Sequence, residues 1–80
     1  MLTKLSAGPR VVGAKQVKRA VEAGNAKRVF LASDADPKVT EPVAAACAGK
    51  EIPTETGFTM RELGRACGIA VGAAVAAILA

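Results

Sequence analysis

The sequence predicts an α/β fold, in which helices pack on a sheet, because apolar strand segments alternate with helical segments along the chain. The first observation is a short apolar segment at residues 10–12 that turns through one glycine into an amphipathic helix. The second is the continuous apolar run at residues 29–32, which suits a strand buried on both faces. A strand, a helix and a second strand in this order indicate a crossover unit.

Composition limits the size of the fold and of its core. The chain of 80 residues predicts one domain, residues 1–80. Hydrophobic residues make up 51% of the chain and charged residues 22%, so a folded protein is expected rather than a disordered one. Abundant alanine and glycine predict a thin core in which neighbouring elements approach closely.

The balance of charge favours a polyanionic partner. The chain has 11 basic and 7 acidic residues, a formal net charge of +4 and a pI near 9.5. Many basic domains of this size bind nothing charged, so the charge by itself assigns no function.

The cysteines and the two ends of the chain limit which cofactors and which cellular compartment are expected. Cys47 and Cys67 form no C-x-x-C motif and the chain has no histidine, so no metal site and no cofactor are expected. Two buried thiols are predicted, and a disulfide is left open. The start of the chain lacks the apolar core of a signal peptide, and the apolar C-terminal run is shorter than a membrane span. We therefore expect a cytoplasmic protein without membrane contact.

Two acidic residues follow the buried strand. Asp34 and Asp36 raise the alternative of acid/base or metal chemistry, but a turn explains them at lower cost, with Asp36 as a helix cap and Pro37 in the first helical turn. Pro42 argues against an unbroken helix from Pro37. The regular helix is therefore expected from about residue 40 or 41 to residue 48.

Capping and breaking signals also predict the remaining elements. Pro53 marks the edge or the entry of a short strand. Thr59 and Glu62 form a capping box that opens a helix to about Cys67. The other expected elements are a short helix at residues 1–7, a strand at 10–12 that must pair within a sheet, a helix at 14–23, a strand at 29–32 and a strand at 52–56. Residues 73–80 fit either a helix or a central strand.

The apolar segment Ile69-Ala70-Val71, with Gly68 before it and Gly72 after it, admits two interpretations. Exposed apolar loops reduce solubility, so the segment either folds inward or stays outward to contact a flat partner such as a nucleobase. From the residues alone, the inward arrangement is favoured.

The start of the helix at residues 14–23 is the most informative feature of the sequence. A helix N-terminus carries free amide donors and a partial positive charge, so acidic residues and a capping Asp, Ser or Thr are expected there. This helix instead begins with cations and follows Gly13. The exposed residues of its cationic side are Lys15, Gln16 and Arg19, with Lys18 at the border and Glu22 four residues beyond Lys18. An ordinary solvated face is the alternative, but the reversed charge favours a phosphate-binding site.

Four stretches, in order and spread over nearly the whole chain, carry a family resemblance. They are Gly13-Ala14-Lys15-Gln16-Val17-Lys18-Arg19-Ala20, Ala32-Ser33-Asp34-Ala35-Asp36-Pro37, Glu51-Ile52-Pro53 and Glu62-Leu63-Gly64-Arg65-Ala66-Cys67-Gly68-Ile69. Together they resemble the kink-turn-binding ribosomal protein family of the large-subunit "L seven Ae" type, which also includes the protein cores of box C/D guide ribonucleoproteins. The chain is most similar to the short bacterial members, which carry the same Lys-Gln pair after the glycine.

The resemblance implies a fold, a ligand and a set of contacts. The fold is a three-layer α/β/α sandwich with a mixed sheet of about four strands, which makes the C-terminal run a strand. The ligand is the kink-turn, a sharply bent RNA duplex held by tandem sheared G·A pairs beside a three-nucleotide bulge. The ribosome or another ribonucleoprotein is a further expected partner, and the protein is expected to be a monomer. The RNA-binding residues are Gly13, Ala14, Lys15, Gln16, Lys18 and Arg19 at the helix start, against the guanine edges and phosphates, and Ile69, Ala70 and Val71, over the flipped bulge nucleotide.

Two positions depart from the family pattern. Many members carry Asn at the position of Lys15 and Glu at the position of Gln16. A carboxylate accepts hydrogen bonds from guanine N–H groups more strongly than a neutral amide does. Looser and more electrostatic base selectivity is therefore expected for this chain.

The predicted function is a non-enzymatic RNA-binding protein that recognises kink-turns in ribosomal or structured regulatory RNA. One alternative is a small anion- or nucleotide-binding domain that uses the turn at Gly13 as a phosphate cradle, although the chain lacks a P-loop and any constellation for turnover. Another is a protein–protein module that contacts a ribosomal partner through residues 69–71.

Overall fold

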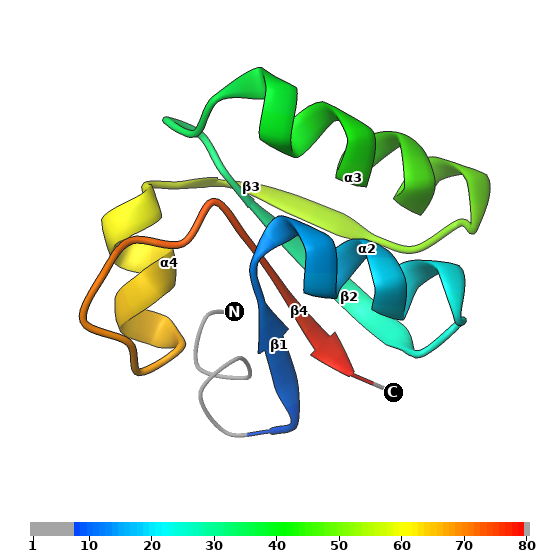
Figure 1. Ribbon diagram of the computed structural model, residues 1–80, viewed down its shortest axis with the longest axis horizontal. Helices are drawn as coiled ribbons and strands as arrows, with labels where there is room; N and C mark the ends of the chain where they lie inside the picture. The colour runs from blue at the N-terminus through cyan, green and yellow to red at the C-terminus, as the bar shows by residue number, and fades with distance from the viewer. Residues whose placement is uncertain (1–7, 80) are drawn as a thin grey trace.

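Helices and strands alternate throughout the part of the chain that the structure describes (Figure 1). The structure is a computed structural model and describes residues 8–79, so the helix expected at residues 1–7 lies outside the described residues. The elements are β1 (Arg10–Val12), α2 (Ala14–Glu22), β2 (Ala26–Ala32), α3 (Pro37–Gly49), β3 (Thr54–Phe58), α4 (Met60–Ala66) and β4 (Val75–Leu79). The ambiguous C-terminal segment is therefore a strand.

The four strands form one mixed sheet in the order β1-β4-β2-β3. β4 is antiparallel to both of its neighbours, whereas β2 and β3 are parallel. β1 and β2 therefore point the same way, as the expected crossover requires, but the last strand in sequence lies between them. The carboxyl ends of β1, β2 and β3 and the beginning of β4 consequently meet at one edge of the sheet. This edge, which carries Gly13, Ser33 and Ala74, is referred to below as the loop edge.

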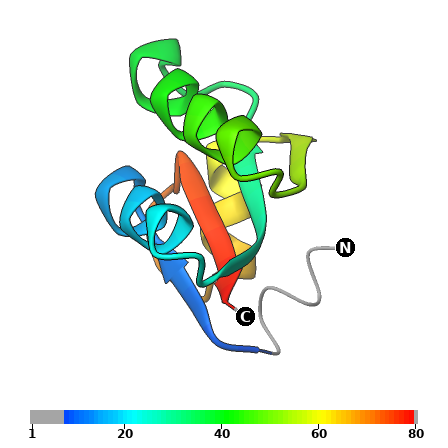
Figure 2. The ribbon, with the colours of Figure 1, turned by 90° about the vertical axis from the view of Figure 1, so that its right-hand side faces the viewer.

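Each face of the sheet is covered by helices and has its own core. α2 and α3 pack together on one face, where Val17, Val43 and Cys47 are buried (Figure 2). α4 covers the other face, where Leu63 and Phe30 are fully buried. The three-layer α/β/α sandwich with a mixed four-stranded sheet is confirmed.

The structure corrects the expected start of α3. This helix runs unbroken from Pro37 and contains Pro42, whereas the sequence predicted a start at about residue 40 or 41. Proline has no N–H for the carbonyl group of Lys38, but Lys38 and Pro42 are both exposed, so water can satisfy that carbonyl. Val43 and Cys47 are buried one turn apart, and their packing against the sheet outweighs the local cost of the proline.

Two strands have bounds that differ from the predicted ones. β3 covers Thr54–Phe58 rather than residues 52–56, because Ile52 packs against the core beneath α3 instead of pairing. It is an edge strand, as Pro53 indicates. β2 begins at Ala26, before the predicted run at residues 29–32, because its polar first half already pairs with β4.

The starts of α3 and α4 follow the predicted capping. The carboxylate of Asp36 accepts a hydrogen bond from the first turn of α3 at 2.9 Å. Thr59 and Glu62 form the reciprocal capping box of α4, with hydrogen bonds of 3.1 and 2.8 Å. Asp34 also serves α4, because its carboxylate accepts from the amide of Met60 at 2.7 Å. The turn-and-cap interpretation of Asp34 and Asp36 is therefore confirmed.

Candidate nucleic-acid interface

The N-terminus of α2 lies at the loop edge and carries no capping side chain. Gly13 precedes the helix with a φ of 103°, a conformation that favours glycine, and its amide donates to the carbonyl of Val75 at 3.0 Å. The first amide to bond within the helix is that of Val17, which donates to the carbonyl of Gly13 at 2.9 Å. Within residues 8–79, no acceptor takes a hydrogen bond from the amides of Ala14, Lys15 or Gln16. Three donors therefore point out of the helix start.

The cationic side of α2 is exposed along its whole length. Val17 and Val21 are buried and Ala20 packs against the core. The exposed polar side chains of the helix are Lys15, Gln16, Lys18, Arg19 and Glu22. Glu22 forms no ion pair with Lys18, and the one ion pair within the described range joins Arg28 to Glu55. The positive charge of this face is therefore available to a ligand.

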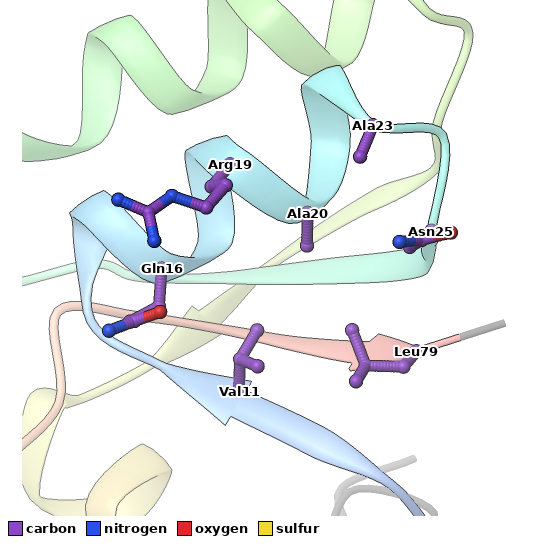
Figure 3. A pocket seen from close by; sticks show the side chains of 7 residues that line it. All are labelled: Val11, Gln16, Arg19, Ala20, Ala23, Asn25 and Leu79. Carbon is purple, nitrogen blue, oxygen red and sulfur yellow. The ribbon is translucent and has the colours of Figure 1, made fainter.

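An open groove runs beside α2 along the edge strand β1 (Figure 3). It has a volume of about 320 Å³ and is lined by Val11, Gln16, Arg19, Ala20, Ala23, Asn25 and Leu79. Figure 3 shows Gln16 and Arg19 toward one end of the groove and Asn25 at the other, with Val11 and Leu79 on the strands below. Local sequence patterns do not predict this groove, because Val11 and Leu79 are far apart in the chain and only the pairing of β1 with β4 brings them together.

The apolar loop after α4 is exposed, so the inward arrangement favoured from the residues alone is wrong. Val71 is 71% exposed and Ile69 is 37% exposed. The backbone of the loop is nevertheless held against α4: the amide of Ile69 donates to Gly64 at 3.1 Å, and that of Ala73 donates to Met60 at 2.9 Å. The loop is therefore fixed in position while its apolar side chains face outward.

A cation at the head of β1 has a structural role that the sequence did not reveal. The guanidinium group of Arg10 donates two hydrogen bonds, of 2.7 and 3.1 Å, to the carbonyl of Cys67 at the end of α4. A cation at a helix C-terminus is favourable because unpaired carbonyls and a partial negative charge gather there. Arg10 thus ties the base of the apolar loop to the sheet and is occupied within the protein.

The loop edge brings the two predicted contact regions onto one continuous part of the surface. The chain leaves the apolar loop into β4 at Val75, whose carbonyl binds Gly13 at the start of α2. The preceding carbonyl, of Ala74, accepts from Ala32 at 2.8 Å. Residues 13–16 therefore adjoin the end of the loop, and Ile69 and Val71 lie farther along α4. Direct assignment of these residues to RNA remains a prediction.

The remaining reactive groups are buried. Cys47 and Cys67 are free thiols, one in each core, as predicted. Burial raises the pKa of both thiols, and for Cys67 the positive charge of Arg10 partly opposes that rise. Among residues 8–79, no cluster of three or more His, Cys, Asp or Glu side chains could hold a metal ion. Within the same residues, each helix is too short or too polar to cross a membrane.

Comparison with known proteins adds independent information. The model of the ribosomal protein L7Ae/L30e/S12e/Gadd45 family matches residues 2–80. The chain is 45% identical to the RNA-binding protein YbxF of Geobacillus stearothermophilus over 75 aligned residues. The alignment covers 94% of this chain and 92% of that protein. An RNA-binding protein of Caldanaerobacter subterraneus is 48% identical over 68 residues, covering 85% of this chain and 83% of that protein. Among solved structures, the 15.5kD RNA binding protein of Giardia lamblia superimposes with a TM-score of 0.92 at 31% identity, covering 99% of this chain and 70% of that chain.

Proposed function

The chain belongs to the ribosomal protein L7Ae/L30e/S12e/Gadd45 family, and we propose from this and from its exposed cationic helix start that it is a non-enzymatic RNA-binding protein that recognises kink-turns. Relatives that match nearly its full length are named RNA-binding proteins. The observation that carries the proposal is the junction of α2 and the apolar loop at the loop edge. Free amide donors and cations lie there next to the end of the loop, which carries exposed apolar side chains farther along α4.

The geometry of this junction suits a bent RNA better than a straight duplex. The major groove of regular A-form RNA is too narrow to admit a helix, so a helix start reaches base edges only where the duplex is distorted. A sharp kink opens the groove beside the sheared G·A pairs and presents an unstacked nucleotide next to it. α2 would enter the opened groove while Val71 and Ile69 cover the unstacked base.

Each side chain of the helix start has a role that follows from its chemistry. Lys15 and Arg19 can donate to O6 and N7 of guanine or to phosphates, and Lys18 to phosphates. Gln16 can both donate and accept at a base edge. Binding of the bent form would raise its population by the difference in affinity between the bent and straight conformations. The proposed targets are ribosomal or structured regulatory RNA in the cytoplasm.

A gel-shift or anisotropy titration tests this function with two RNAs that differ only at the kink. One is a synthetic kink-turn, and the other has its sheared G·A pairs replaced by Watson–Crick pairs. We expect tight, salt-dependent binding of the first and much weaker binding of the second. Lys15→Ala and Arg19→Ala should each weaken binding of the kink-turn by roughly tenfold and lower the log–log salt slope by about 1.

The control for these variants is Lys27→Ala, which removes one exposed positive charge from the end of β2 remote from the loop edge. It should leave both the affinity and the preference for the kink nearly unchanged. Equal affinity of the protein for the two RNAs would refute recognition of the kink.

A further inference from the structure

A second cationic surface lies on α4, on the opposite face of the sheet from α2. Arg61 and Arg65 are both exposed, and their spacing of four residues puts them one turn apart on the same side of the helix. They are next in sequence to Met60 and Gly64, the row against which the apolar loop packs. The two arginines therefore flank the exposed loop on its α4 side.

Nearby acidic residues do not neutralise these arginines. The carboxylate of Glu62 is turned back to the amide of Thr59, and that of Asp34 is bound to the amide of Met60. Neither carboxylate forms an ion pair with Arg61 or Arg65 among the described residues. Like charges four residues apart also repel, so the pair costs the helix some stability without an internal partner.

Three kinds of surface thus follow one another from the start of α2 through the apolar loop to α4. The cations of α2 come first, joined through Gly13 to the end of the loop at Val75. The exposed apolar side chains of Ile69 and Val71 follow. Arg61 and Arg65 follow on α4, next in sequence to the two residues against which the loop packs. Figure 1 shows the loop passing from the end of α4 to the beginning of β4 near the start of α2.

We propose that Arg61 and Arg65 bind the phosphate backbone of the second duplex arm of a kinked RNA, the arm across the bulge from the sheared G·A pairs. This inference rests on the proposed function. A kinked duplex has one arm, then an unstacked nucleotide, then a second arm that folds back, which matches the order of cations, apolar loop and arginines on the protein. Arginine suits phosphate because its planar guanidinium group can donate two parallel hydrogen bonds. Such contacts position the arm without reading its sequence.

The arrangement also gives shape selectivity. The two cationic surfaces lie on opposite faces of the sheet, so an RNA that bends around the loop would neutralise both at once. The arginines would therefore add affinity for the bent form.

The test uses two kink-turn RNAs that share the sheared pairs and the bulge. In one, the second arm extends for a full helical turn; in the other, it is trimmed to the pairs that close the bulge. The double variant Arg61→Gln/Arg65→Gln is compared with the unmodified protein. As a matched control, Lys27→Gln/Lys50→Gln removes two exposed positive charges from the end of the molecule opposite the loop edge.

With the long-arm RNA, we expect the arginine variant to lose about tenfold in affinity and about 2 in log–log salt slope. With the trimmed RNA, the variant and the unmodified protein should bind equally, because the group that the arginines contact is gone. The lysine control should match the unmodified protein on both RNAs. Circular dichroism checks that each variant is folded. If the double variant does not fold, the single variants Arg61→Gln and Arg65→Gln are measured instead, and each should show part of the loss in affinity.

Two results would overturn the inference while leaving the proposed function in place. One is an equal loss of affinity on both RNAs, which would mean that the arginines act on the kink or on general charge. The other is no loss on either RNA, which would point to an acidic protein surface as their partner. Failure of the unmodified protein to prefer the kinked RNA would instead refute the proposed function itself.

Discussion

At the scale of single residues, the close contact between Gly64 of α4 and the apolar loop determines where the exposed side chains lie. A Cβ atom at residue 64 would sit 2.1 Å from the carbonyl oxygen of Val71 and 3.1 Å from the Cα of Gly72. Both neighbours are backbone, so they cannot rotate away as a side chain would. The glycine therefore lets the loop approach the helix closely enough for its amides to bond there.

Gly64→Ala should destabilise the protein by about 1–3 kcal/mol, because relieving the clash requires the loop or α4 to shift. The free energy of unfolding in urea, followed by circular dichroism, measures the loss. Gly49→Ala is the matched control: nothing lies within 4 Å of its Cβ position and it ends α3. Alanine is the better helix former, so this control should be neutral or stabilising by up to roughly 1 kcal/mol. Equal stability of the two variants would contradict the close contact.

Val71 offers the cleanest single-residue test of the loop. Because its side chain is 71% exposed, Val71→Asp should change the free energy of unfolding by less than about 0.5 kcal/mol. It should nevertheless weaken binding of a kink-turn RNA, since it replaces an apolar contact with a negative charge beside phosphates. Thr54→Asp adds the same charge at an exposed position at the start of β3 and should leave binding unchanged. Unfolding of the Val71 variant would mean that the loop belongs to the core.

At the scale of elements, the three helix starts at the loop edge differ in how their amides are satisfied. Asp36 caps α3, and α4 has both its capping box and the carboxylate of Asp34. α2 has neither a cap nor an acidic residue in its first turn. The acidic side chains of this edge therefore accept hydrogen bonds at the starts of α3 and α4, and the start of α2 keeps its positive charge.

The proline within α3 permits a direct test of why that helix is continuous. If buried packing overrides a local cost, Pro42→Ala should restore the hydrogen bond to Lys38 and stabilise the protein by about 1–3 kcal/mol. Thermal unfolding by circular dichroism detects this as a raised midpoint. Pro37→Ala is the control, because Pro37 occupies the first helical position, where the missing N–H has no helical partner. A lowered midpoint for the Pro42 variant would show that its ring makes packing contacts that outweigh the lost bond.

At the scale of the whole molecule, each of the two cores contains one thiol, so ionisation and alkylation of the thiols can follow the unfolding of both cores. Burial raises the pKa of Cys47 and of Cys67, so each thiol stays neutral in the folded protein at a pH where it ionises in the unfolded chain. Ionisation of the unfolded chain favours unfolding. The stabilising contribution of the thiols is therefore complete at neutral pH and declines as the pH rises above about 8.5, the ordinary pKa of a thiol.

Urea midpoints between neutral pH and about pH 10 should fall with rising pH in the unmodified protein, because the unfolded chain loses thiol protons that the folded protein retains. The chain has no histidine or tyrosine side chain that would add to this change. In Cys47→Ala/Cys67→Ala the decline should be much smaller. In addition, both thiols of the folded protein should resist alkylation equally if the layers unfold together. Rapid modification of one thiol alone would mean that its core opens independently.

Local patterns were sufficient to predict the strand at residues 10–12, the caps at Asp36 and Thr59 and the uncapped start of α2. Each of these depends on residues adjacent in sequence, whose hydrogen bonds and periodicity are set before distant contacts form. The family resemblance added the layer arrangement. The bounds of α3 and β3 were predicted less well, because they depend on tertiary packing. Burial of Val43 outweighs the signal of Pro42 within α3, and Ile52 packs against the core instead of beginning β3.

By itself, the sequence determined that a cationic, uncapped helix follows a short strand, and that an apolar segment lies between two glycines. Only the tertiary structure decided that this segment faces outward, that Arg10 is tied to the end of α4, and that β4 joins the loop to the start of α2. The reason is that exposure and long-range hydrogen bonds depend on which chain segments meet in space. Here they depend on β4 lying between β1 and β2, an arrangement that local residue patterns do not encode.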